Sequence, residues 1–93
     1  MGWGRVALLE GIREYGSITK AAKSMNMAYR HAWKLVDSMN RQSRKPLVEV
    51  AIGGKGGGGA WLTKEGEKSI RLFRQFAGDF DTFLVREQKK LSF

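Results

Sequence analysis

The chain has 93 residues, no cysteine and a formal net charge of +8. This length suits one domain with a modest core, the lack of cysteine excludes disulfides and thiolate chemistry, and no apolar run approaches the ~20 residues that a membrane span needs. The charge is uneven, since residues 20–45 hold seven basic side chains and one acidic one. A locally basic surface favours a polyanionic partner such as DNA, although such a surface can also serve only solubility.

Two short helices and a tight turn are predicted near the N-terminus. A helix over Trp3–Tyr15 follows from apolar residues that recur at spacings of three and four, and Gly16 ends it. Ser17 is suited to cap a second helix over Ile18–Ser24. Asn26 then occupies a turn position that often demands a positive φ, which asparagine tolerates better than most residues.

A third helix is predicted over about residues 28–40, so that a helix-turn-helix spans about residues 17–40. Its apolar positions recur at helical spacing and would face the core. Its outward flank would then carry Tyr29, Arg30 and Lys34. The second helix of such a pair fits the major groove of B-DNA, while the helix before it crosses the backbone.

Side chains on the third helix have the chemistry for reading DNA. Arg30 can make a bidentate contact to guanine, whereas Lys34, one turn later, suits a phosphate. Tyr29 can donate its hydroxyl to a phosphate or pack on a thymine methyl, and His31 can donate to a base or a phosphate. Trp33 could stack on nucleic acid, pack in the core or lie under a hairpin. The residues predicted to contact DNA are Ser17, Thr19, Lys20, Ala28, Tyr29, Arg30, His31, Lys34, Arg44, Lys55 and Gly56.

A β-hairpin, the wing, is predicted over about residues 47–62. Residues 47–52 alternate as a half-buried strand, and six of the seven residues at 53–59 are glycine, broken only by Lys55. The spacing of the glycines in this run matches a dinucleotide-binding pattern, but a second short strand follows where that pattern needs a helix. A glycine-rich tip can instead lie in the minor groove or against a phosphate, with Lys55 supplying charge.

The last predicted helix covers about residues 64–89, and Thr63 is suited to cap it. Its apolar stripe contains four phenylalanines, more than a small domain buries easily against its own core. One interpretation is that the stripe packs within the chain, and the other, which we favour, is that it pairs with a second copy. The predicted dimer contacts are Trp3, Phe73, Phe76, Phe80, Phe83 and Leu84.

Catalytic and metal sites are not expected. One histidine and no cysteine leave no metal-binding cluster, so neither a metal nor a cofactor is predicted. The carboxylates of the last helix lie among lysines and arginines and are interpreted as solvated charges. No nucleophile is paired with a base in the sequence pattern. The chain is therefore predicted not to be an enzyme.

Several motifs in this order carry a family resemblance. They are Gly-Ser-Ile-Thr-Lys-Ala-Ala-Lys at 16–23, Met-Ala-Tyr-Arg at 27–30, Pro-Leu-Val-Glu at 46–49 and the glycine-rich run at 53–60. Together they resemble the N-terminal DNA-binding domain of the ModE family of molybdate-dependent transcriptional regulators, a winged helix related to the LysR type. The resemblance covers about residues 6–76.

The resemblance implies a dimer that places the third helix in the major groove and the wing beside it. Tyr29, Arg30, Lys34 and Lys55 carry over as DNA-reading positions, and the C-terminal helix carries over as the dimer contact. Full-length family members also have C-terminal molybdate-binding domains of the β-barrel type, which these 93 residues do not contain. Molybdate is thus not an expected ligand of this chain, which is either a stand-alone protein or a piece of a longer one.

The sequence therefore predicts a mainly α single domain over residues 1–93, a winged helix-turn-helix with a small β-hairpin and a long C-terminal dimerisation helix. The predicted function is that of a homodimeric, sequence-specific DNA-binding transcriptional regulator. It would bind double-stranded DNA in the cytoplasm, where it would be associated with the nucleoid, and it would not bind a membrane. Two alternatives remain at this point: a winged-helix module that docks an acidic protein, and a sequence-neutral architectural DNA binder.

Overall fold

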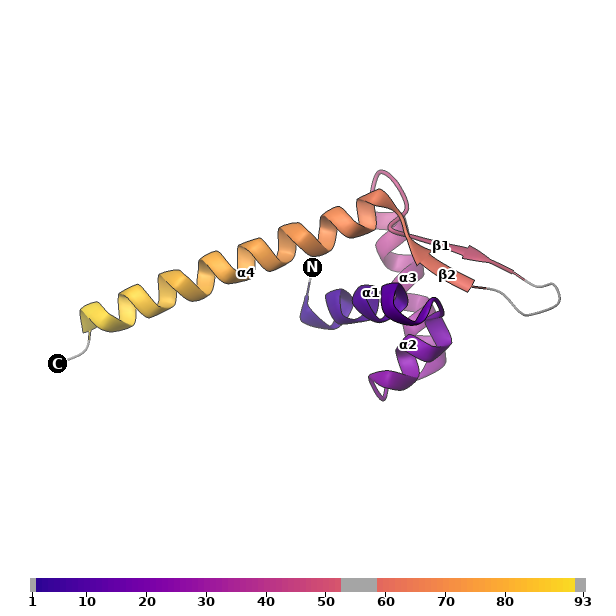
Figure 1. The fold of residues 1–93 in the computed structure, drawn as a ribbon, viewed down its shortest axis with the longest axis horizontal. Helices are drawn as coiled ribbons and strands as arrows, with labels where there is room; N and C mark the ends of the chain where they lie inside the picture. The colour runs from indigo at the N-terminus through magenta and orange to yellow at the C-terminus, as the bar shows by residue number, and fades with distance from the viewer. Residues whose placement is uncertain (1, 53–58, 92–93) are drawn as a thin grey trace.

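The computed structural model describes residues 2–52 and 59–91, except for the side chains at 80–83, 85 and 88–91 of the last helix. Helices and one antiparallel hairpin follow each other along the chain as the sequence predicts (Figure 1). This is the mainly α winged-helix fold. The described elements are α1 (Trp3–Tyr15), α2 (Ile18–Ser24), α3 (Tyr29–Gln42), β1 (Val48–Ala51), β2 (Gly59–Leu62) and α4 (Lys64–Leu91).

Three local signals place the first helices as predicted. Gly16 ends α1 in the left-handed region, with φ 65°, and donates its N–H to the carbonyl of Ile12 at 2.8 Å. Ser17 caps α2, because its Oγ accepts the backbone N–H of Lys20 at 3.2 Å. Asn26 takes the positive φ of 53° expected at the turn. These short-range interactions fix how α2 and α3 follow α1.

Helix α3 differs from its predicted bounds by one residue at its start and two at its end. Ala28 is the N-cap and has extended backbone, so the helix begins at Tyr29. The helix continues to Gln42, where Arg5 of α1 donates to the Gln42 Oε1 at 3.1 Å. Contacts with another helix, which no local pattern specifies, thus extend the last turn.

The core is built around α1. Four of its apolar side chains, Val6, Leu8, Leu9 and Ile12, are completely buried, and they share one cluster with residues from every other helix and from both strands. Burial of this kind is the main favourable contribution to folding. The buried apolar residues are Val6, Leu8, Leu9, Ile12, Ile18, Ala21, Ala22, Ala32, Val36, Met39, Leu47, Val48, Ala60 and Ile70.

The hairpin is attached to the helical body at its base. Its antiparallel register pairs Val48 with Leu62 and Glu49 with Trp61. The N–H of Ala60 donates to the carbonyl of Gly16 at 2.9 Å, which ties β2 to the α1–α2 junction. Because side chains alternate across a strand, Val48 and Ala60 are buried on one face while Glu49 and Trp61 are exposed on the other.

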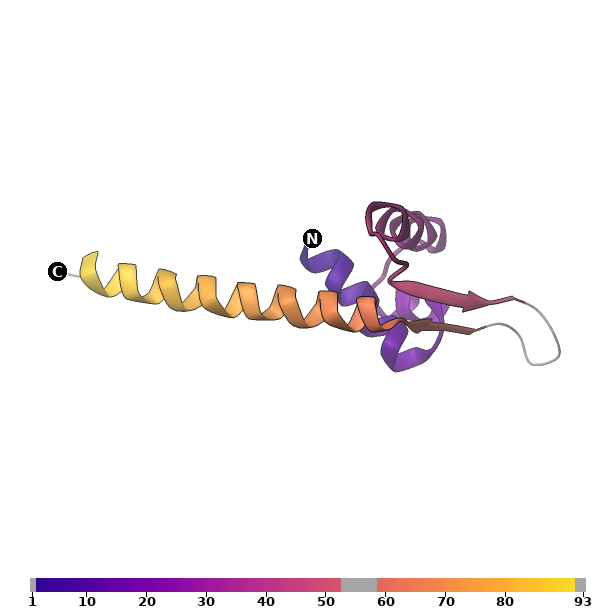
Figure 2. The same ribbon diagram turned by 90° about the horizontal axis from the view of Figure 1, so that it is seen from above.

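Helix α4 extends from the body in the direction opposite to the hairpin (Figures 1 and 2). Thr63 begins it, since its Oγ1 accepts the N–H of Gly66 at 3.1 Å and donates to the carbonyl of Pro46 at 2.6 Å. Ile70 is buried and Phe73 half-buried, so the first half of α4 packs on the core. The helix is about 42 Å long at 1.5 Å per residue, and its second half projects beyond the body.

Candidate nucleic-acid interface

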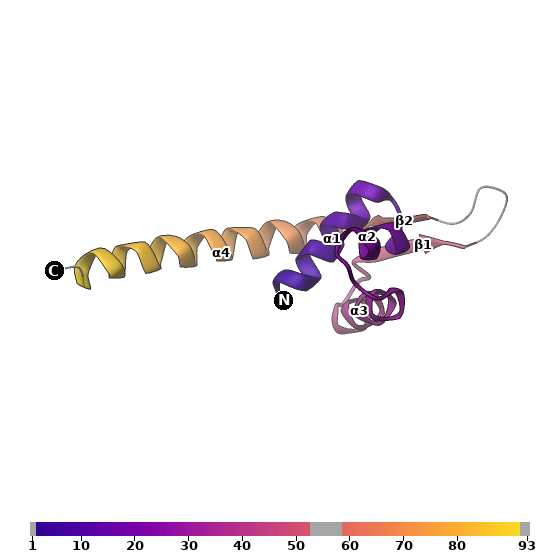
Figure 3. The ribbon, with the colours of Figure 1, turned by 90° about the horizontal axis from the view of Figure 1, so that it is seen from below.

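The two flanks of α3 differ sharply in chemistry. Ala32, Val36 and Met39 are buried in the core. The other flank, in the first half of the helix, exposes Tyr29, Arg30, His31 and Lys34. In the views from above and below, α3 is seen close to end-on, to one side of the hairpin (Figures 2 and 3). The helix therefore presents an aromatic and cationic surface to solvent, as its sequence predicts.

The one acidic residue on α3 is neutralised by its own helix. Asp37 lies four residues before Arg41, and the Arg41 Nη2 is 2.5 Å from the Asp37 Oδ2. Both side chains are largely exposed, so the pair contributes little to stability. Its effect is electrostatic, because the Arg41 guanidinium offsets the negative charge of the carboxylate on the helix that carries Lys34.

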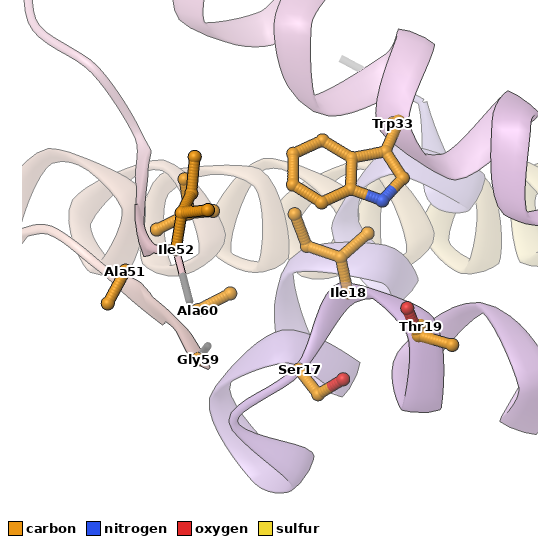
Figure 4. A pocket seen from close by; sticks show the side chains of 9 residues that line it. Ser17, Ile18, Thr19, Trp33, Ala51, Ile52, Gly59 and Ala60 are labelled. Atoms are coloured by element: carbon orange, nitrogen blue, oxygen red, sulfur yellow. The ribbon is translucent and has the colours of Figure 1, made fainter. Parts of the chain in front are cut away.

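The start of α2 lies against α3 and the base of the wing. Ser17, Ile18 and Thr19 line a pocket of about 240 Å³ together with Trp33 of α3 and residues of β1 and β2 (Figure 4). Trp33 is half-buried and packs on the core, and the ring of Tyr29 meets it edge-on at 6.1 Å. Of the three roles open for Trp33 in the sequence, the structure shows two together, since the side chain packs on the core and lies beside the base of the wing.

The remaining predicted DNA contacts surround this surface. Lys20 is exposed on α2, and Ala28 is exposed just before α3. Arg44 is exposed beyond the C-terminal end of α3, whereas Tyr29 begins the helix. Ser17 is half-buried. The two wing positions, Lys55 and Gly56, lie outside the described residues.

Asn40 holds the recognition helix to the wing, which sequence reasoning missed. Its Oδ1 accepts the backbone N–H groups of Leu47 and Val48 at 2.9 and 3.1 Å, and its Nδ2 donates to the Val48 carbonyl at 3.0 Å. One amide thus satisfies three backbone groups at the start of β1. The available signal was an asparagine in the last turn of an amphipathic helix shortly before a strand, but that signal does not identify the partners.

Replacing Asn40 by alanine should reduce the free energy of unfolding by about 2 kcal/mol, because partly buried backbone groups would lose their partners. The wing would also lose its fixed orientation relative to α3. Urea denaturation measures the first effect and amide hydrogen exchange at Leu47 and Val48 the second. The matched control is Gln42→Ala, which removes only the exposed bond to Arg5. Equal exchange at these two amides in both variants would contradict this role for Asn40.

The predicted dimer contacts are only partly available to a second copy. Trp3 is 59% exposed and meets Phe73 edge-on at 4.9 Å, while Phe73 also packs on the core. Phe76 is 68% exposed and Leu84 is 47% exposed. Leu72, which was not among the predicted contacts, is 53% exposed beside them. The side chains of Phe80 and Phe83 lie outside the described residues.

Ion pairs fix the direction of α4 relative to α1. Arg74 contacts the Glu10 carboxylate with Nη2 at 2.5 and 2.6 Å and with Nε at 3.2 Å. Arg13 contacts Glu67 at 2.9 Å. Glu67, which the sequence indicated only as a solvated charge, thus has a partner on α1, although its side chain remains 42% exposed. The sequence pattern did not indicate these ion pairs, because Arg13 and Glu67 lie 54 residues apart in the chain and Glu10 and Arg74 lie 64 residues apart.

Comparisons with known proteins identify the family. No protein-family model matches the chain. The transcriptional regulator ModE of Yersinia pestis is 49% identical over 69 residues, which are 74% of this chain and 26% of that protein. The chain is a ModE-like winged helix-turn-helix domain. The DNA-binding transcriptional dual regulator ModE of Escherichia coli strain K12 is 46% identical over 69 residues, with the same coverage. The ModE-like domain therefore spans about a quarter of the length of these relatives.

A solved structure supports the fold independently. The ModE-like domain aligns with BenM_DBD, from its complex with benA site 1 DNA, with a TM-score of 0.65 over 99% of this chain and 100% of that one. Sequence identity is 18%, so the likeness concerns the fold alone. The relatives in sequence are regulators by name, which agrees with the expectation that the chain is not an enzyme.

No helix within the described ranges is both long and apolar enough to cross a membrane. Within those same ranges, no group of three or more histidine or acidic residues is placed to hold a metal ion.

Proposed function

We propose that this ModE-like domain is the DNA-binding part of a homodimeric transcriptional regulator that acts in the cytoplasm on the nucleoid. Helix α3 enters the major groove, and the glycine-rich wing contacts the adjacent backbone or minor groove. The observation that carries the proposal is the division of α3 into a buried apolar flank and an exposed flank with Tyr29, Arg30, His31 and Lys34. The regulators named ModE and the fold of the BenM domain add support.

The residues divide between reading bases and holding phosphates. Arg30 and Tyr29 lie in the first turn of α3, the part of a recognition helix that meets base edges. Lys34 and Lys20 flank them and meet phosphates, which position the protein without reading sequence. Arg44, beyond the opposite end of α3, meets the phosphate backbone on the other side of the major groove, which is about 12 Å wide. Lys55 adds a phosphate or minor-groove contact from the wing.

The dimer forms through α4 and the start of α1. Its support is the exposed apolar surface of Trp3, Leu72, Phe76 and Leu84, on a helix that projects beyond the body. Exposed apolar surface of this extent often marks an interface. A two-fold axis through this surface would present the two α3 helices to half-sites about one duplex turn apart, or a small multiple of it.

Selection of bound duplexes from a random DNA pool at about 0.15 M salt tests the proposal. A palindromic consensus is expected, because a two-fold dimer reads inverted half-sites. Binding without any consensus, lost steeply with salt, would indicate a sequence-neutral architectural protein. Binding to an acidic protein but not to DNA at matched salt would indicate an interaction module instead.

Two substitutions should separate base reading from phosphate holding. Arg30→Ala is expected to cost about 1–3 kcal/mol of operator affinity and to relax specificity at one base position of each half-site. Lys55→Ala should weaken all sequences alike and reduce the slope of log K against log salt by about one. Fluorescence anisotropy with the selected operator and single-base variants measures both effects. An Arg30→Ala protein that keeps the parent's base preferences would refute this assignment.

A further inference from the structure

The pocket between α2, α3 and the wing contains two features that the proposed contacts do not use. Nε1 of Trp33 is buried and has no hydrogen-bond partner within the described residues. Ile52, immediately after β1, is 90% exposed although its side chain is entirely apolar. Both residues line the same pocket, and Figure 4 shows the indole lying over Ile18 with its nitrogen edge toward α2.

These features are unfavourable in the free protein for different reasons. A buried N–H without an acceptor loses its hydrogen bond to water and gains none. An exposed isoleucine keeps apolar surface in water. One occupant that brings an acceptor oxygen and a hydrocarbon body to the pocket would relieve both. A deoxyribose with its phosphate has these two parts.

The position of the pocket fits such an occupant. If α3 lies in the major groove and the wing lies on the neighbouring minor groove, the strand that separates the two grooves passes between them. The described pocket has α3 on one side, the wing residues Ile52 and Ala60 on the other, and Ser17 and Thr19 of the α2 start along its edge. The sugar–phosphate backbone is therefore the part of the duplex that reaches it.

We propose that this pocket seats one deoxyribose–phosphate unit of the bound DNA strand. The sugar packs on Ile52 and on the indole of Trp33, and the phosphate accepts from Trp33 Nε1–H after a small rotation of the indole exposes it. The hydroxyl of Ser17 also donates, because its oxygen already accepts from Lys20 and its hydrogen is left to point outward. This inference rests on the proposed DNA-binding function and names a contact within it.

The chemistry of the pocket selects a phosphate that is part of a duplex over a free anion. None of the lining residues that the structure describes is ionised, so the pocket alone holds a free anion weakly. The exposed cations nearby, Lys20 and Arg30, act on neighbouring parts of the duplex and deliver the strand. Inorganic phosphate at millimolar concentration should consequently leave the fluorescence of Trp33 unchanged, whereas operator DNA should change it.

Trp33→Phe tests the N–H donor, with Trp61→Phe as matched control. Trp61 lies on the opposite face of the hairpin from the pocket-facing residues Val50 and Ala60, and it does not line the pocket. Trp33→Phe should lower operator affinity about tenfold or more, the loss expected for a hydrogen bond to a charged acceptor. The melting temperature of the free protein should fall only a little, because the unsatisfied N–H is removed together with the indole. Trp61→Phe should bind like the parent.

A second measurement separates contact from packing. Neutral methylphosphonates are placed one at a time in each operator strand, and affinity is measured for the parent and for Trp33→Phe. One linkage should weaken the parent strongly and the variant little, which identifies the phosphate that accepts from Trp33. Equal losses at every linkage in both proteins would assign Trp33 to packing alone and overturn the proposal.

If Trp33→Phe does not fold, a chemically synthesised chain can carry 3-benzothienylalanine at position 33 instead. This side chain keeps the shape of indole but lacks the N–H. Ile52→Ala should in addition weaken binding severalfold, because it removes the apolar contact with the sugar. If the parent selects no DNA at all, the proposed function fails. If the parent binds its operator and the isosteric chain binds equally well, only the pocket inference fails.

Discussion

Gly66→Ala is expected to destabilise the domain by about 3 kcal/mol, at the upper end of the usual cost of overpacking. A Cβ at this position would overlap the carbonyl oxygen of Leu47 and lie 3.2 Å from its carbonyl carbon. These are backbone atoms, so a rotamer change cannot relieve the contact. The same carbonyl accepts the N–H of Thr63 at 3.0 Å, so moving it away would break the junction between the wing and α4.

The matched control for Gly66→Ala is another glycine of the same helix. A Cβ at Gly78 would meet nothing within 4 Å, and alanine favours the helical state by up to about 1 kcal/mol relative to glycine. Gly78→Ala should therefore raise the midpoint of urea denaturation while Gly66→Ala lowers it. The opposite signs distinguish a backbone collision from helix propensity. A stable Gly66→Ala protein with native hydrogen exchange at Thr63 would show that α4 can begin elsewhere.

The parts of the fold that were predictable depend on short-range chemistry. Gly16, Ser17, Asn26 and Thr63 each end, cap or turn a helix through atoms a few residues away. Local rules describe such interactions well. The requirement for glycine at position 66 is different, because it comes from Leu47, nineteen positions earlier in the chain. Packing of this kind cannot be derived from the residues that neighbour it in sequence.

The same distinction applies to the candidate site. Helical periodicity placed Tyr29, Arg30 and Lys34 on the outward flank of α3, since the buried flank was evident from its apolar residues. Trp33 stayed open, because its environment depends on where the base of the wing lies relative to α2 and α3. Asn40 was missed because its three partners are backbone groups of Leu47 and Val48, at the start of the hairpin. The residues that hold the elements of the site in place were thus harder to predict than the residues exposed on its surface.

Leu72→Glu is expected to convert the proposed dimer into a monomer and to lower operator affinity by about 10²- to 10⁴-fold. The side chain is 53% exposed on α4, close to Phe73 and Phe76, so in a dimer a carboxylate there would be buried without a cation. The loss of affinity follows because two linked half-sites bind with the effective concentration that the linkage creates, and a monomer loses it. Sedimentation equilibrium and anisotropy on full and half operators measure the two effects.

Gln75→Glu is the matched control, because it adds the same charge on α4 at an exposed position that does not line the apolar patch of Ser69, Leu72, Phe73 and Phe76. It should remain dimeric and bind like the parent. The half operator separates loss of the dimer from loss of the fold. Leu72→Glu leaves α2 and α3 intact, so it should bind a half-site as the parent does. A variant that loses the half-site as well has lost its fold. A variant that stays dimeric would place the interface elsewhere than on this part of α4.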